Sequence, residues 1–323
     1  MTDVGLGFWI GFHAFVVAVL ALDLGIVQKK AHAVGKREAA CWVGVWVGCA
    51  LVFAAGVGWF LGSEKCFEYL TGYVIEQALS VDNLFVFLVI FASFGVPPKL
   101  QRRVLLWGIL GAVLMRASFI VAGAALIRRF HWLMYVLGFF LVVTAVRLAL
   151  RKEEDEEIDP GRHPVVRVVR RILPVSSHFD GEHFFTHRSG KWLATPLLVV
   201  LAVVETTDVV FALDSIPAIF AITTDPFIVY TSNIFAILGL RAMYFLLAGA
   251  MSQFRFMKEG LSVVLGFVGV KMLVADFVHV PVVLSLGIVA TTLVVAVVAS
   301  VLFPAPVARP ETSGQPAVVP VDD

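Results

Sequence analysis

Charged residues and cysteines are both scarce in this sequence. Asp, Glu, Lys and Arg together make up 15% of its 323 residues, whereas about a quarter of a soluble globular chain is charged. Hydrophobic residues make up 59% of the chain, and the mean hydropathy is +0.91. This composition excludes an ordinary soluble domain and indicates a polytopic membrane protein. The net charge of +1 gives no sign of a nucleic-acid partner.

The three cysteines, Cys41, Cys49 and Cys66, form no Cys-x-x-Cys motif. We therefore expect them to be small buried hydrophobic side chains rather than a redox pair or metal ligands. The chain also lacks a basic segment ahead of its first apolar run. Residues 4–27 are too long for the core of a signal peptide, so a retained first helix is expected.

Apolar runs of about 20 residues, each long enough to cross the hydrocarbon layer as a helix, follow one another along the chain. They predict an all-α polytopic membrane protein with nine transmembrane helices. The predicted spans lie near residues 5–27, 40–61, 70–94, 102–125, 131–149, 193–216, 227–250, 260–277 and 281–303.

Basic residues gather in alternate loops, which sets the expected orientation. The loops after the first, third and seventh spans hold Lys29, Lys30, Lys36, Arg37, Lys99, Arg102, Arg103, Arg255 and Lys258. The opposite side holds only Lys65, Arg128 and Arg129. The N-terminus is therefore expected outside the cell and the C-terminus in the cytoplasm.

The spans divide the chain into six predicted segments. These are a two-helix segment at 1–61, a three-helix unit at 66–150, a cytoplasmic loop at 151–192, a second three-helix unit at 193–278, a last transmembrane helix at 281–303 and a disordered cytoplasmic tail at 304–323. Within the loop, alternating valines and arginines from Val165 to Ile172 could lie on the anionic leaflet. Ser189-Gly190 is expected at the turn of a small hairpin.

Two apolar runs carry the same acidic pattern. Glu76 is followed six residues later by Asp82-Asn83, and Asp208 is followed six residues later by Asp214-Ser215. An acidic side chain at the centre of a membrane helix costs about 2.5–3.5 kcal/mol even on the lenient insertion scale. Six residues rotate an ideal helix by about 600°, so the two acids of a run lie about 120° apart rather than on one face. The pattern predicts a cation path.

The two three-helix units share further landmarks. Each has an Arg-Ala step in its second helix, Arg116-Ala117 and Arg241-Ala242, and each opens its third helix with Val-Leu-Gly-Phe. Because three helices per unit is an odd number, the two units would have opposite orientations in the membrane. This is the inverted-repeat arrangement of many secondary transporters, which place their site where the repeats meet. Chance similarity in apolar sequence is the alternative.

A local break of one helix would let both acids of a run reach one pocket. Pro217 cannot donate a hydrogen bond to the carbonyl of Leu213 and crowds it, so a break beside Asp214 is expected. Simple termination of the helix there is the alternative. Asn233 is expected either to cap the next helix or to add an amide oxygen to the site.

The candidate ligands are all hard oxygen donors, which suit Mg²⁺, Ca²⁺ or Mn²⁺ rather than Cu⁺ or Zn²⁺. The predicted metal-handling residues are Glu76, Asp82, Asn83, Asp208, Asp214 and Ser215. Supporting or ion-pairing residues are Asp23, Ser80, Arg116, Glu205, Asn233 and Arg241. The arginines can pair with some acids, but the acids outnumber them, so a divalent cation or protons would neutralise the rest. A purely structural network of buried ion pairs is the alternative.

Several long motifs resemble the TerC/Alx family of bacterial integral membrane proteins. They are Ala21-Leu-Asp-Leu-Gly25, the run from Glu76 to Phe87, the run from Phe211 to Ala218, Asp225-Pro-Phe227 and the run from Thr231 to Arg241. The family is named for tellurium resistance, includes a branch described as membrane-bound redox modulators, and is grouped with the LysE-type transporter superfamily. Members have been linked to manganese export. The resemblance implies Mn²⁺ efflux across the bacterial inner membrane and assigns ion handling to Glu76, Asp82, Asp208 and Asp214.

We therefore expect an exporter of a divalent cation, with Mn²⁺ favoured and proton exchange as a possible coupling. The alternative functions are a redox modulator and a tellurium-resistance protein that acts as a membrane scaffold. An enzyme is not expected, nor is a resident cofactor. The expected partners are the lipid bilayer and the transported cation.

Overall fold

The computed structural model describes residues 5–27, 35–130, 132–150, 163–188, 190–248, 256–278 and 280–303. The side chains of residues 20–27, Lys36, Asp82 and Phe85 lie outside this description. The predicted roles of Asp23 and Asp82 therefore concern side chains outside the described part, as does the predicted tail at 304–323.

Ten helices and one two-stranded sheet make up the described residues. The helices are α1 (Leu6–Val27), α2 (Lys36–Leu61), α3 (Ser63–Ser93), α4 (Pro98–Arg129), α5 (Leu133–Leu150), α6 (Pro164–Ile172), α7 (Pro196–Phe220), α8 (Pro226–Leu247), α9 (Met257–Leu273) and α10 (Val282–Leu302). The strands β1 (Phe185–Arg188) and β2 (Lys191–Ala194) pair antiparallel, with Arg188 opposite Lys191 across the predicted turn. The predicted class, a helical polytopic membrane protein, is confirmed.

Each predicted span coincides with a helix, but the helices differ in length. Seven of those described, α2, α3, α4, α5, α7, α8 and α10, are long and apolar enough to cross a membrane. Helix α9 has 17 residues, and the apolar part of α1 with described side chains is Leu6–Val19. The count of nine crossings stays a prediction.

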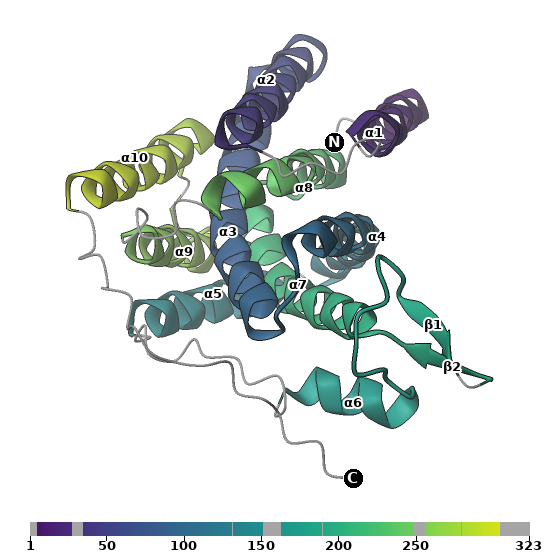
Figure 1. The fold of residues 1–323 in the computed structure, drawn as a ribbon. Coiled ribbons are helices and arrows are strands. Elements are labelled where there is room, and N and C mark those ends of the chain that lie inside the picture. Colours follow the sequence, from purple (N-terminus) through teal and green to yellow (C-terminus); the bar gives the residue numbers. More distant parts are fainter. Residues whose placement is uncertain are drawn as a thin grey trace.

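The helices differ strongly in how much of their surface is covered by protein. In the most apolar window of each helix, 89% of α8 and 69% of α3 is buried inside the protein, against 17% of α2, α5 and α10. Helix α3 runs through the middle of the molecule, while α1, α2 and α10 lie at its edge (Figure 1). The polar residues of α3 and α8 are therefore shielded from lipid by other helices.

Two pairs of helices from the predicted repeat units pack in opposite directions. Gly72 of α3 lies against Ile219 near the end of α7, whereas Glu76, one turn further along α3, is joined through Arg116 to Asp208 and Ser215, earlier in α7. In the same way, Gly138 at the start of α5 lies against Met272 near the end of α9, and Ala145 accepts a hydrogen bond from Ser262. An inverted repeat requires such antiparallel packing, and the repeat itself stays a prediction.

The expected break at Pro217 is wrong. Helix α7 continues through Pro217 and ends one turn later at Phe220. A proline near the end of a helix removes a single internal hydrogen bond, so the helix can absorb it without unwinding.

The cap expected from Asn233 is also wrong. Asp225 precedes the first residue of α8, and its Oδ1 accepts a hydrogen bond from the backbone N–H of Phe227 at 3.0 Å. Asn233 lies two turns further on, fully buried inside the helix. Its other predicted role, as an amide ligand near the site, stays a prediction.

A single residue connects α2 to α3. Gly62 has φ +97°, a conformation that side chains with a Cβ rarely adopt. Glycine at this position therefore lets the chain turn sharply from one membrane helix into the next.

Candidate functional site

Arg116 of α4 holds the centre of the molecule together. Its Nε and Nη2 donate to the two carboxylate oxygens of Asp208 on α7, at 3.3 and 3.0 Å. Its Nη1 donates to Oε1 of Glu76 on α3 and lies 3.5 Å from Oγ of Ser215. One guanidinium thus joins three helices, which only a planar group with several fixed donors can do.

This group of three charged side chains, the Arg116 centre, is almost completely sealed. The side chains of Arg116, Glu76 and Asp208 are 1%, 0% and 7% exposed. A buried charge pair is tolerated only where good geometry and hydrogen bonds compensate for lost hydration. Two carboxylates against one guanidinium leave a net charge of −1 at the centre.

Several buried polar atoms of α3 and α8 have no hydrogen-bond partner in the described structure. They include Oε2 of Glu76, Oγ of Ser80 and both amide atoms of Asn233. Ser80 lies one turn from Glu76 on the same face of α3. Asn233 belongs to α8, which packs closely on α3 where Ser232 meets Gly72. Buried polar atoms of this kind usually find a hydrogen-bond partner or bind an ion in a folded protein.

The second acid of the α7 run points elsewhere. Asp214 is partly buried and accepts a hydrogen bond from Oγ1 of Thr144 on α5, at 3.2 Å. This agrees with the rotation of about 120° expected between acids six residues apart on a continuous helix. The two acids of this run therefore face different neighbouring helices.

Glu205 lies close to the backbone of α4. A Cβ added at Gly111 would collide with Oε1 of Glu205, so the carboxylate occupies the space that this glycine leaves open. Glu205 is one turn from Asp208 on α7, near enough for the two charges to interact.

The structure gives the burial of two more of the predicted site residues. Asn83 is buried in α3, and Arg241 is partly buried in α8. Within the ranges that the structure describes, no three His, Cys, Asp or Glu side chains group so that they could hold a metal ion. Glu76 and Asp208, which the sequence analysis placed in one metal site, are joined here through Arg116, and their role in binding a metal stays a prediction.

A second charged group, the Lys65 cluster, lies near the start of α3. Lys65 is 2.7 Å from Oε2 of Glu68 and 3.5 Å from Oδ2 of Asp225. Oγ1 of Thr223 also donates to Glu68, at 2.6 Å. The sequence analysis did not identify this cluster, although the Lys-x-x-Glu spacing and the Asp-Pro helix start were visible signals.

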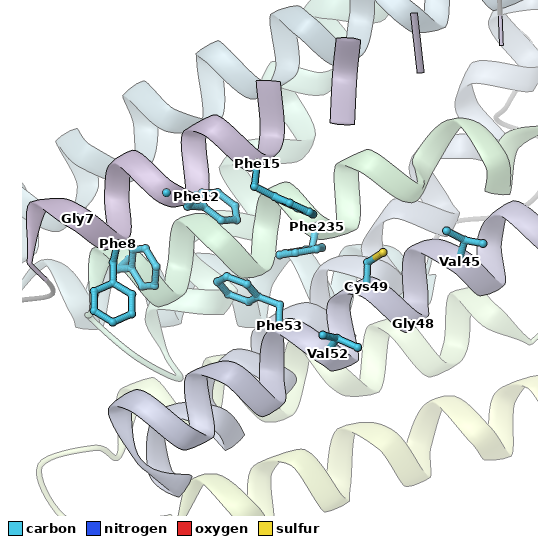
Figure 2. Close-up of a pocket in the computed structure, with 12 residues that line it drawn as sticks. Gly7, Phe8, Phe12, Phe15, Val45, Gly48, Cys49, Val52, Phe53 and Phe235 are labelled. Atoms are coloured by element: carbon cyan, nitrogen blue, oxygen red, sulfur yellow. The ribbon is translucent and has the colours of Figure 1, made fainter. Parts of the chain in front are cut away.

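A cavity of about 760 Å³ lies between α1, α2 and α8, and none of the three charged residues of the Arg116 centre lines it. Phenylalanines from α1 and α2 point toward one another across it, with Phe235 of α8 behind them (Figure 2). None of its lining side chains is charged, and Cys49 supplies the one heteroatom among them. This cavity offers no oxygen ligands for an ion.

Long apolar helices around a shielded polar centre define an integral membrane protein. The family model for the integral membrane protein TerC family matches residues 61–307. The chain therefore belongs to the TerC family.

Its similar relatives cover almost the whole chain. A Myxococcus xanthus protein named "Uncharacterized membrane protein STKORF319" is 54% identical over 296 residues, which cover 92% of each chain. Proteins named "Putative membrane-bound redox modulator Alx" from Salmonella typhi and Escherichia coli K12 are 50% and 49% identical. Those alignments cover 90% and 87% of this chain and 92% and 90% of the relatives. No solved structure matches.

Proposed function

We propose that this protein exports a divalent metal cation across the bacterial inner membrane, with Mn²⁺ as the favoured cargo. The observation that carries the proposal is the Arg116 centre, where two buried carboxylates share one guanidinium and one carboxylate oxygen has no partner. Such a centre is costly to keep in a membrane unless its charge is used.

The arrangement of the centre suits a site that alternates between two states. Without cargo, the guanidinium of Arg116 provides the positive charge that Glu76 and Asp208 require. A divalent cation entering between these carboxylates takes over that role and releases Arg116. The protein then never exposes an uncompensated pair of carboxylates to its low-dielectric interior, which would cost several kcal/mol.

The donor chemistry near the centre supports a hard cation. Carboxylate and hydroxyl oxygens from Glu76, Asp208, Ser80 and Ser215 are the ligand types that Mn²⁺, Mg²⁺ and Ca²⁺ prefer. Asp214, held by Thr144 on another face of α7, is a separate acid that a coupled proton or the departing ion would use.

The test is metal uptake into vesicles that contain the purified protein, with Mn²⁺, Ca²⁺, Mg²⁺ and Zn²⁺ offered in turn beside an internal pH probe. We expect Glu76→Gln and Asp208→Asn each to slow Mn²⁺ movement on the order of tenfold or more, because losing one charged ligand costs at least about 1.4 kcal/mol. Arg128→Gln is the matched control, since Arg128 is exposed on the same helix and donates only to a backbone carbonyl among the contacts described. Wild-type transport by both acid variants would rule out this site.

A redox modulator is the second candidate, and it is favoured by the names of the relatives and by three free cysteines. Cys49 and Cys66 are partly buried, but Cys41 is exposed, so the buried position expected for all three is wrong for Cys41. Replacing all three with serine separates the candidates, because a thiol-based modulator loses its effect and a cation exporter does not. A scaffold role, the third possibility, predicts that Glu76→Gln leaves the cellular phenotype unchanged.

A further inference from the structure

Helix α6 carries an apolar surface wider than the protein covers. Val166 is buried in a cluster that also contains Val104 of α4 and Leu197 and Val200 of α7. Val165 and Val169 pack partly against the same cluster. On the outer edge of this apolar surface, Val168 and Ile172 are 55% and 70% exposed.

The rest of the helix is basic. At about 100° per residue, Arg167, Arg170 and Arg171 fall together on the side that no valine occupies. All three arginines are exposed. One edge of the apolar surface, at Val166, is covered by the protein. The other edge, at Val168 and Ile172, is uncovered, and the arginines lie beside it. Strong separation of this kind is typical of helices that lie in the plane of a membrane interface.

The position of α6 places it at the membrane surface. It packs against the first turns of α7, a membrane-spanning helix, and lies with the hairpin beside the start of that helix (Figure 1). Arg103, at the start of α4, is 3.6 Å from Glu182 and lies over the ring of Phe184, which fixes the segment before the hairpin to the same end of the bundle. Helix α6 thus lies at the end of the bundle where the membrane-spanning helix α7 begins, with its uncovered edge facing away from the protein.

We propose that α6 is a docking surface for anionic phospholipid headgroups of the surrounding bilayer. Val168 and Ile172 enter the acyl region, and Arg167, Arg170 and Arg171 bind the headgroup phosphates. The predicted orientation puts α6 on the cytoplasmic leaflet, which carries the anionic lipids. This inference is independent of whether the protein transports a cation.

Hydrogen exchange of the α6 backbone tests the proposal in the full chain. The protein is placed in nanodiscs of phosphatidylcholine alone or of phosphatidylcholine mixed with phosphatidylglycerol. We expect amides 165–172 to exchange severalfold more slowly in the anionic discs, because each basic side chain near an anionic surface contributes about fivefold in partitioning. Added salt should reduce this difference, since it screens exposed charges.

The triple variant Arg167→Gln, Arg170→Gln, Arg171→Gln should exchange equally in the two kinds of disc. The triple lysine variant should keep the difference, which separates lost charge from lost folding. Arg128→Gln with Arg129→Gln, at the opposite end of α4, is the control and should also keep it. Equal exchange of the wild-type helix in both discs, or a lipid effect that survives removal of the three arginines, would overturn the proposal.

Discussion

The Arg116 centre and the Lys65 cluster have the same plan in different surroundings. In each, one basic side chain lies between two carboxylates from different helices or helix ends. The three side chains of the Arg116 centre are 0–7% exposed, whereas Lys65, Glu68 and Asp225 are 23%, 10% and 13% exposed. Water near the Lys65 cluster can hydrate a charge that loses its partner, and the interior around Arg116 cannot. Removing the basic side chain should therefore lower the free energy of unfolding severalfold more at the Arg116 centre than at the Lys65 cluster.

The largest effect is expected from Arg116→Gln. It leaves Glu76 and Asp208 facing each other without a cation, so the free energy of unfolding should fall by about 3–5 kcal/mol. Thermal or SDS-induced unfolding in detergent measures the loss. Arg128→Gln on the same helix should change stability by less than about 0.5 kcal/mol. Equal losses in the two variants would contradict the contrast.

Asp208→Asn should cost less, about 1.5–3 kcal/mol, because Arg116 keeps its bond to Glu76 while its bonds to a charged partner weaken. The same unfolding measurement applies. The double variant Arg116→Gln, Asp208→Asn should be more stable than the sum of the single losses predicts, since the two side chains interact directly. Additive losses would show that the pair is not coupled.

Gly72→Ala probes the segment of α3 between the two charged groups, one turn from Glu68 and one turn from Glu76. The added Cβ would lie 2.9 Å from Oγ of Ser232 and 3.3 Å from Cγ2 of Ile219, so the side chains of Ser232 on α8 and Ile219 on α7 must move to make room. Such overpacking costs about 1–3 kcal/mol. Gly56→Ala on α2 meets nothing within 4 Å and should be neutral or slightly stabilising. A Gly72→Ala protein as stable as the wild type would show that the packing of α3 against α7 and α8 adjusts to the extra methyl group at little cost.

The smallest effect is expected from Lys65→Gln, at most about 1 kcal/mol, because the pair is partly hydrated. The loss should shrink further in high salt, since partly exposed pairs are screened. Unfolding of the variant and the wild type at low and high salt measures both the loss of stability and its dependence on salt. A loss as large as that of Arg116→Gln would remove the difference between the two groups.

The sequence predicted the helices well because membrane spans leave strong local signals, and it singled out the acidic residues for the same reason. Runs of apolar residues of membrane-spanning length rarely have another meaning, and Glu76 and Asp208 stood out because acids in such runs are costly. The spacing also correctly indicated that Asp208 and Asp214 face different neighbours. These predictions needed only the geometry of a single helix.

The sequence could not predict which side chains meet across helices. Arg116 was expected to pair with some acid, but its simultaneous contact with Glu76 and Asp208 depends on how three helices cross. Asn233 resembled a cap because of its place near the predicted start of a span, whereas Asp225 begins that helix eight residues earlier. Pro217 does not break α7, because the free-energy cost of a proline in a helix depends on how far it lies from the end of that helix.

The one-residue joint at Gly62 links the depth of the Lys65 cluster to the outer surface of the molecule. Trp59 and Phe60, in the last turn of α2, are 86% and 69% exposed, and aromatic residues in such positions anchor at the level of lipid headgroups. Because only Gly62 separates α2 from α3, the depth of Trp59 and Phe60 in the membrane also sets the depth of Lys65 and Glu68. A shift of α2 across the membrane should therefore move Lys65 and Glu68 by a similar distance.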